Sequence, residues 1–474
     1  MSAAKPTRFA LYTALLSAMC IAFHTSAETL SEIYEQSLQN DPQLRADRAA
    51  YLAGQESKNI GRASLLPVIS AVGEYSETDS DDQSRTVFTQ TTGSGRAGDT
   101  EVDSENYSLT LQQPLFDLSA WFGFQQGKQL SLQAQAQFGA DQQSMILRVA
   151  DAYFNVLRAQ ENLSTAQSEE TAIQRQLEQT KERFEVGLLP ITDVHEAQAT
   201  FDDAAVNTLE TRGALDIAFE ALSVLTGQNH MQLAGLKDNF PVVNPEPLNR
   251  EDWVQFSLQN NFSLKSARFA REAAQQNAKS KKSEHLPTLT GSLSYYNNHS
   301  DSEFNGLDGN GNPLNSPSFS DQDGHTAALR LEIPLFTGGL TSAQRRQAYQ
   351  QFIQAQENFI ASQRNTVQQA RSQHLQVVTD SARVKARKQS ITSAQSALEA
   401  TQAGYDVGTR NIVDVLLAQR NLFQAKRNYA NARYDYISSL LNLKAVAGQL
   451  SPDDIYQLNA WLDPQLQVLR AGAQ

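Results

Sequence analysis

Residues 405–419 read Tyr405-Asp-Val-Gly-Thr-Arg-Asn-Ile-Val-Asp414-Val-Leu-Leu-Ala-Gln419, and they have a counterpart 221 residues earlier. That counterpart reads Phe184-Glu-Val-Gly-Leu-Leu-Pro-Ile-Thr-Asp193-Val-His-Glu-Ala-Gln198. Each copy joins the end of one long helical pattern to the start of another. Because a recurring helix-turn-helix indicates a repeated supersecondary unit, the sequence predicts a two-fold internal repeat.

Very long helices are expected before and after both copies. Residues 117–186 and 338–407 contain no proline and are rich in Gln, Ala, Glu and Arg. At 1.5 Å per residue each would be roughly 105 Å long. Helices 191–226 and 412–447 carry apolar or small residues at alternating spacings of three and four, a seven-residue repeat typical of coiled coils. These seam positions are Phe201, Ala204, Thr208, Thr211, Leu215, Ala218 and Leu222, and Leu422, Ala425, Tyr429, Ala432, Tyr436, Ser439 and Leu443.

Strand patterns precede the long helices in each half. Helices are expected at 29–64 and 249–284, and each ends at a Leu-Pro pair. Apolar and polar residues then alternate over strands 67–76, 105–113, 287–296 and 325–333, with exposed polar loops at 77–104 and 297–324 between them. The apolar sets are Ile69, Ala71, Gly73 and Tyr75; Tyr107, Leu109 and Leu111; Leu289, Gly291, Leu293 and Tyr295; and Ala327, Leu329, Leu331 and Ile333.

Strands of about ten residues with one apolar face fit a tilted membrane crossing, in which lipid contacts the Leu and Tyr side chains. A soluble, half-buried hairpin fits the same pattern. Four strands do not close a transmembrane barrel, and open strand edges are not tolerated in lipid. If these strands span a membrane, several chains must therefore share one barrel, and the pattern leaves their number open.

Composition and the N-terminus favour an exported acidic protein. The chain has 474 residues, with 39 Lys and Arg against 52 Asp and Glu, so nucleic acid is a poor candidate partner. Residues 1–27 have the pattern of a signal peptide, with Lys5 and Arg8 before an apolar stretch and small residues up to Ala27. Cys20, the chain's cysteine, lies in that segment. No run of 18 apolar residues follows, so we expect no transmembrane helix.

Several motifs together resemble the TolC-like outer-membrane channel proteins of Gram-negative bacteria, over nearly the whole mature length. They are Leu-Leu-Pro at 65–67, Gln-Pro-Leu-Phe-Asp at 113–117, Ala-Tyr-Phe-Asn-Val-Leu at 152–157, Arg-Phe-Glu-Val-Gly-Leu at 183–188, Ile-Thr-Asp-Val at 191–194, residues 403–416, and Asn-Ala-Arg-Tyr-Asp-Tyr at 431–436. The resemblance implies a homotrimer, with four strands per chain in a shared twelve-stranded outer-membrane barrel and with helical coiled coils forming a periplasmic tunnel.

The resemblance also implies partners and site residues. The helix tips would close the tunnel and contact a periplasmic adaptor, which is itself bound to an inner-membrane RND or ABC transporter, and exported drugs or proteins would pass through. The implied residues are a gate latch of Thr192, Asp193, Tyr405 and Arg410; a gate constriction of Asp414 and Leu417; and adaptor-contacting tips of Val186, Gly187, Leu188, Val407, Gly408 and Thr409. Leucine at 417 leaves one acidic ring where the family typically has two.

A purely structural interpretation of the tips remains open. Asp193 and Asp414 fall in the first turn of a helix, where a carboxylate is favoured by the helix dipole. Asn411 would cap that turn, and Gly187 and Gly408 would end the preceding helices in the left-handed conformation.

The predicted organisation is a signal peptide at 1–27, a first repeat at 28–247, a second at 248–450 and a tail at 451–474, with tips at 187–190 and 408–411. We find no nucleophile with an adjacent base, no metal-ligand cluster and no cofactor motif, and we expect no enzymatic activity. The expected function is an outer-membrane export duct with a large periplasmic part. The alternative is a secreted coiled-coil interaction protein without channel activity.

Overall fold

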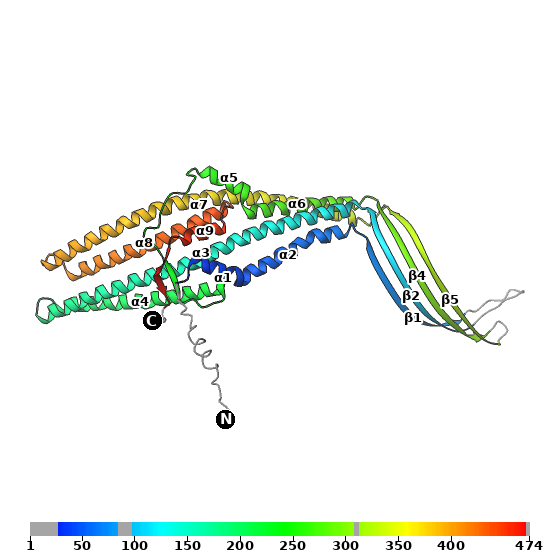
Figure 1. Cartoon of the computed structure of the whole chain (residues 1–474), viewed down its shortest axis with the longest axis horizontal. Helices are drawn as coiled ribbons and strands as arrows, with labels where there is room; N and C mark the ends of the chain where they lie inside the picture. Colours follow the sequence, from blue (N-terminus) through cyan, green and yellow to red (C-terminus); the bar gives the residue numbers. More distant parts are fainter. Residues whose placement is uncertain (1–26, 84–96, 308–311, 471–474) are drawn as a thin grey trace, which may run out of the picture. The chain divides into compact units, whose positions relative to one another are not determined.

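The computed structural model describes residues 27–83, 97–307 and 312–470, so the predicted signal peptide lies outside the described residues except for Ala27. The elements, shown in Figure 1, are α1 (Leu30–Asn40), α2 (Pro42–Ala63), β1 (Val68–Gln83), β2 (Ala97–Phe116), α3 (Leu118–Glu185), α4 (Ile191–Thr226), β3 (Gln232–Leu236), α5 (Arg250–Asn260), α6 (Phe262–Ser283), β4 (Thr288–Leu307), β5 (Pro313–Glu332), α7 (Leu340–Asp406), α8 (Ile412–Val446), α9 (Pro452–Asn459) and β6 (Leu462–Leu469).

The chain forms two compact units, and each contains segments from both halves of the sequence. One comprises residues up to 46, 141–260 and those from 367 onward; the other comprises 47–140 and 261–366. The predicted division between 28–247 and 248–450 therefore follows the sequence repeat and falls inside the first unit. In the order of elements, two helices, two strands and two long helices occur in each half.

The second unit contains a four-stranded antiparallel sheet in the order β1-β2-β4-β5 (Figure 1). Its register places Ile69 opposite Leu111, Leu111 opposite Leu293, and Leu293 opposite Ala327. Because side chains alternate between the faces of a sheet, the apolar sets predicted for the four strands share one face. Strands β1 and β5 form the two edges.

The predicted exposed loops 77–104 and 297–324 are wrong over most of their length, because the strands run through them. Asp79 lies opposite Glu101, and Glu101 lies opposite Glu303, in continuous ladders. Strand pairing uses backbone groups, so a run of Ser, Thr, Asp and Asn can extend a strand although its composition favours a loop. Residues 84–96 and 308–311 lie outside the described part of the chain.

The predicted helices 29–64 and 249–284 are each two helices. Asp41 has extended backbone geometry, with ψ of 114°, between α1 and α2, and Pro42, which follows it, cannot continue the hydrogen-bond ladder. In the second half, Asn261 interrupts the run, and its side chain accepts a 2.8 Å hydrogen bond from the backbone N–H of Leu264. Each break falls at a residue that caps or begins the following helix.

The helices of the second unit approach one another closely at glycines. A Cβ atom added to Gly54 would lie 2.4 Å from Cβ of Ala134, and one added to Gly127 would lie 2.3 Å from the carbonyl oxygen of Ser57. The absent side chains are thus what allows the backbones to come together at these positions.

The long helices α3, α4, α7 and α8 begin and end within two residues of the predicted ranges. In the first unit the seam side chains of α4 and α8 are buried or half-buried, as the seven-residue repeat predicts. The buried seam residues are Ala204, Thr208, Leu215, Leu222, Leu422, Ala425, Ala432, Tyr436, Ser439 and Leu443. In the described part of the chain, none of the helices contains an apolar stretch of the length needed to span a bilayer.

The predicted C-terminal tail, 451–474, contains structure up to residue 470. Helix α9 begins after Ser451, and strand β6 pairs antiparallel with β3. Glu28 adds a parallel bridge to Leu233 of β3. These pairings join segments that are far apart in the sequence. The strands themselves are too short for an alternation of apolar and polar residues to be recognised.

Candidate gate at the helix tips

The first tip ends α3 with a glycine in the left-handed conformation. Gly187 has φ of +77°, and its N–H donates to the carbonyl of Phe184 at 2.8 Å. The N–H of Leu188 donates to the carbonyl of Arg183 at 2.9 Å. This pair of bonds is the Schellman arrangement, which satisfies the last carbonyls of a helix. The prediction that Gly187 ends the helix in the left-handed conformation is confirmed.

The second tip repeats this backbone and adds side-chain bonds. Gly408 has φ of +78° and donates to the carbonyl of Tyr405 at 3.0 Å, while the Thr409 N–H donates to Gly404 at 2.8 Å. The Thr409 hydroxyl also donates to the Gly404 carbonyl, at 3.0 Å. The second tip is therefore fixed by its side chains as well as by its backbone.

The helices that leave the tips begin differently. Asn411 Oδ1 accepts a 2.9 Å hydrogen bond from the backbone N–H of Asp414, which confirms the predicted cap of α8. Pro190 precedes α4 and offers no side-chain cap. Asp193 and Asp414 both lie in the first turn of their helix, where the helix dipole stabilises a carboxylate.

The residues expected to form a latch are placed at the tips, but this single chain does not join the two expected groups. Arg410 approaches Asp414 of its own helix, with Nη1 3.7 Å from Oδ2. The Thr192 hydroxyl donates to Asp193 Oδ1 at 3.3 Å. Among the described residues, neither Thr192 nor Asp193 forms a hydrogen bond with Tyr405 or Arg410. The latch between these groups of neighbouring chains stays a prediction.

Tyr405 belongs to an apolar cluster near the tips, which we call the tip cluster. The Tyr405 side chain is 7% exposed, and its hydroxyl has no hydrogen-bond partner among the described residues. A buried hydroxyl without a partner is destabilising in a single chain. The tip cluster consists of Ile173, Leu177, Ala197, Ala204, Tyr405, Ile412, Val415 and Leu416, with Phe201 and Leu398 packed against it.

Two charged residues that the sequence analysis did not single out meet beside Tyr405. Arg183 Nη2 lies 3.4 Å from Asp406 Oδ1, and the Arg183 guanidinium carbon lies 4.9 Å from the centre of the Tyr405 ring. The sequence positions of the two residues could have indicated this contact. Arg183 lies in the last turn of α3 and Asp406 ends α7, so residues of opposite charge stand at the corresponding helix ends of the two halves.

The adaptor-contacting residues and Leu417 of the constriction are exposed in the single chain, whereas Asp414 is half-buried. Leu417 lies one turn after Asp414 on α8 and is exposed. Val186, Leu188 and Val407 project from the tips with large exposed fractions. Their role as adaptor contacts stays a prediction.

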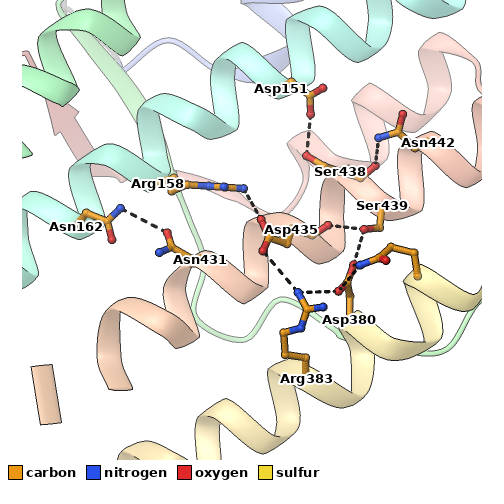
Figure 2. A network of polar contacts seen from close by, with 11 residues as sticks. Asp151, Arg158, Asn162, Asp380, Arg383, Asn431, Asp435, Ser438, Ser439 and Asn442 are labelled. Carbon is orange, nitrogen blue, oxygen red and sulfur yellow. Dashed lines mark hydrogen bonds and ion pairs between the residues drawn. The ribbon is translucent and has the colours of Figure 1, made fainter. Parts of the chain in front are cut away.

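Farther from the tips, a series of polar contacts joins α3 to α8, as Figure 2 shows for part of it. We call it the polar ladder. Its contacts are Ser438 to Asp151 at 2.7 Å, Arg158 to Asp435 at 2.9 Å, Tyr434 to Glu161 at 2.5 Å, Asn162 to Asn431 at 3.4 Å, and Arg427 to Glu169 at 2.5 Å. Glu169 with Arg427 is the last contact of this kind before the tips among the described side chains of α3 and α8.

The polar ladder extends to α7 through a buried carboxylate. Asp380, 1% exposed, lies 3.0 Å from Arg383 and accepts a 2.5 Å hydrogen bond from Ser439 of α8 (Figure 2). Gln376 also donates to Asp380, at 3.0 Å. Arg383 lies 3.8 Å from Asp435, which links α7 to the contact with Arg158.

Comparison with known proteins places the chain in a family. The family model for the outer membrane efflux protein matches residues 33–228 and 253–449. The chain is 38% identical over 438 residues to outer membrane protein TolC of Vibrio cholerae, covering 92% of this chain and 94% of that protein. It is 35% identical to TolC of Escherichia coli, covering 92% and 85%.

Among solved structures, the fold is similar to that of CusC, with a TM-score of 0.73 at 17% identity, covering 89% of this chain and 93% of that chain. That likeness concerns the fold alone, whereas the match to the family model covers most of both halves. The chain belongs to the outer membrane efflux protein family.

Proposed function

We propose that the chain is an outer membrane channel-tunnel gated at its periplasmic tips, residues 187–190 and 408–411. Membership of the outer membrane efflux protein family makes it an outer membrane efflux or secretion channel with a large periplasmic part. The alternative of a secreted coiled-coil protein without channel activity has no support from this membership. The trimer, the barrel, the partners and the gate residues are the finer parts of the proposal.

The observation that carries the membrane part is the aligned apolar face of the sheet. Leu329 and Leu331 on β5, and Ile69 on β1, are exposed although they are large and apolar. A face of this kind, about ten residues long, suits the lipid-facing band of a barrel. The acidic continuation of the same face, with Asp79 opposite Glu101, would lie beyond the hydrocarbon, since charges on a lipid face are destabilising.

The open sheet edges support a shared barrel. In lipid, each unpaired backbone group costs several kcal/mol, so the free edges of β1 and β5 require partners. Pairing β5 of one chain with β1 of the next closes a ring without leaving an edge, as closed symmetry requires. Three chains with four strands each give the proposed twelve-stranded barrel.

The tips, residues 187–190 and 408–411, form the proposed gate. Tyr405 and Arg410 would meet Thr192 and Asp193 of a neighbouring chain, and the exposure of the Arg410 side chain, 61%, supports this because another chain can reach its guanidinium. Asp414 would form one ring of three carboxylates, next to a ring of Leu417. We expect weaker binding of cations there than at two acidic rings.

The exposed tips would dock a periplasmic adaptor through their apolar side chains. The adaptor would connect the channel to an inner-membrane RND or ABC transporter, which supplies the energy of export. The contacting residues are Val186, Gly187, Leu188, Val407, Gly408 and Thr409. Drugs or secreted proteins would then cross the outer membrane by passive conduction, without an enzymatic step in this chain.

The test is to purify the protein from outer membranes in detergent and to measure its mass and its conductance. We expect a trimer that dissociates on heating and that forms discrete channels in a planar bilayer. A monomer that stays soluble without detergent and inserts no channels would contradict the proposal. The heat-dissociated sample is the control for conductance by contaminants.

A further inference from the structure

We propose that Arg183 is a further gate residue, which clasps the α3/α4 hairpin to the α7/α8 hairpin of the same chain. The clasp consists of Arg183 with Asp406 and the ring of Tyr405. This inference rests on the proposed gate and deepens it, because the clasp would have to release before the tips separate.

The geometry gives one cation two contacts on the other hairpin. Arg183 extends from the last turn of α3, with Nη2 3.4 Å from Asp406 Oδ1 and its guanidinium 4.9 Å from the centre of the Tyr405 ring. An arginine can pair with a carboxylate and stack on an aromatic face at the same time because its guanidinium is planar. Both partners lie at the end of α7, so both contacts join the same two hairpins.

A neighbouring side chain positions the carboxylate. Gln402, one turn before Asp406 on α7, donates a 3.2 Å hydrogen bond from Nε2 to the Oδ1 atom that faces Arg183. The exposed fractions of the Arg183 and Asp406 side chains are 38% and 52%. The clasp is therefore ordered by local contacts yet accessible to water, and water or another protein can replace its partners.

The contacts around the clasp explain why it would control opening. Between the Glu169–Arg427 contact and the tips, the two hairpins meet through the tip cluster, which is apolar apart from the Tyr405 hydroxyl. Apolar burial is non-directional, so helices packed in this way can shift without losing a specific partner. The clasp is directional and charge-assisted, so it favours one position of the tips by the modest energy of an exposed ion pair.

The distance from the polar ladder to the clasp leaves a segment that can move. Glu169 and Arg183 are separated by 14 residues of α3, which corresponds to roughly 21 Å of helix. Movement of that segment would leave the Arg427–Glu169 contact and the rest of the polar ladder intact. The chain would then open at its tips while α3 and α8 stay bound to each other along the polar ladder.

The Glu169–Arg427 pair provides a matched control because it joins the same two hairpins. Its atoms lie 2.5 Å apart, and the exposed fractions are 18% for Arg427 and 8% for Glu169. This pair is shorter and more buried than the clasp. If a general loosening of the hairpins were enough to open the channel, removing this pair would therefore open it more readily than removing the clasp. Replacing both residues by Gln leaves no unpaired buried charge.

The experiment measures the open probability of single channels in a planar bilayer. The variants are Arg183→Gln, Asp406→Asn, the charge exchange Arg183→Asp with Asp406→Arg, and the control Glu169→Gln with Arg427→Gln. Loss of one exposed ion pair changes an equilibrium by about threefold, and three clasps in a trimer would multiply to about thirtyfold. We expect Arg183→Gln and Asp406→Asn each to raise the open probability by about thirtyfold. We expect the charge exchange to reverse most of that rise.

Further outcomes separate the inference from the proposed function. We expect the control pair to leave the open probability within about twofold of the wild type. Conducting channels whose open probability is the same in the wild type and in Asp406→Asn would overturn the clasp and leave the channel standing. An equal rise in the control would also overturn the clasp, since any loosening would then suffice. A wild-type protein that forms no channels would overturn the proposed function and the clasp with it.

Discussion

The α3/α4 hairpin and the α7/α8 hairpin are held together in different ways along their length. In the polar ladder, hydrogen bonds and ion pairs such as Arg158–Asp435 and Arg427–Glu169 join them at intervals. Near the tips, the apolar tip cluster and the exposed Arg183–Asp406 contact take over. Directional contacts fix the register of a helix pair, whereas apolar contacts permit several. The difference separates a fixed part of the proposed tunnel from a part that can move.

Burial makes the two regions differ in energy as well. A buried ion pair is costly to break because one charge is left without water or a partner. An exposed pair contributes at most about 1 kcal/mol. Asp380 is 1% exposed in the ladder region, and Asp406 is 52% exposed at the tip. The contrast leads to three predictions, given in order of decreasing effect.

The largest effect is expected from Asp380→Asn. The substitution keeps the size of the side chain but removes the charge that faces Arg383 and accepts from Ser439. We expect a loss of about 2–3 kcal/mol in the free energy of unfolding, because Asn has one acceptor oxygen where Asp380 uses two for Gln376 and Ser439, and a buried donor is left unpaired; the measurement is denaturant titration of the assembled protein. Asp406→Asn is the matched control, with an expected loss below about 1 kcal/mol. Equal losses in the two variants would remove the distinction between the regions.

An intermediate effect is expected from alanine at the glycine turns. Gly187 and Gly408 have φ of +77° and +78°, and a Cβ atom would meet nothing within 4 Å at either position. The cost is therefore backbone strain alone, about 1–2 kcal/mol each. We expect similar losses of thermal stability in Gly187→Ala and Gly408→Ala, together with altered channel opening.

Gly227, at the opposite end of α4, is the control for those two variants. Its φ is +69°, and it too has open space around the missing Cβ. Gly227→Ala should therefore lower stability by a similar amount and leave channel opening unchanged. If Gly227→Ala changed opening as strongly as the tip variants, strain anywhere in these helices would affect the gate.

The smallest effect is a pH dependence within the polar ladder. Burial raises the pKa of the Glu161 carboxyl, and Asp238 adds to the rise, while the hydrogen bond from Tyr434 and the charge of Arg433 oppose it. A raised carboxyl pKa means that the folded state binds the proton more tightly than the unfolded state. This contribution to stability is complete below the ordinary glutamate pKa and is lost as the pH rises through the folded value.

Glu161→Gln tests that dependence because it keeps the acceptor for Tyr434 and removes the titration. We expect the stability of the variant, relative to the wild type, to rise between mildly acidic and neutral pH, as followed by thermal unfolding across that range. Glu182→Gln, at an exposed position of the same helix, is the control. A constant difference between Glu161→Gln and the wild type at all pH values would contradict the assignment.

The limits of the long helices could be predicted because local residues determine them. Gly187 and Gly408 end α3 and α7 through their left-handed backbone, and the seam positions repeat every seven residues. The extent of the strands could not be predicted in this way. Asp79 and Glu303 lie in polar stretches whose composition favours a loop. They are part of the sheet because their backbones pair with residues in other strands.

The candidate site divides along the same line. The sequence could predict Asn411 as a helix cap and Asp414 in the first turn. The cap and the N–H that it accepts from are three residues apart in the chain. The contact of Arg183 with Asp406 joins residues 223 positions apart, and it depends on how the hairpins pack. The positions of Thr192 and Asp193 relative to a neighbouring chain remain predictions from the family resemblance.

The central claim, a channel held closed by contacts at its tips, is tested most directly by single-channel conductance. The comparison is between the wild type and the double variant Arg410→Ala with Tyr405→Phe. The account predicts a small conductance for the wild type and a clearly larger one for the variant, because the variant lacks the tyrosine hydroxyl and the guanidinium proposed to bind the neighbouring chain. Equal conductance in the two proteins would contradict the claim that these contacts close the channel.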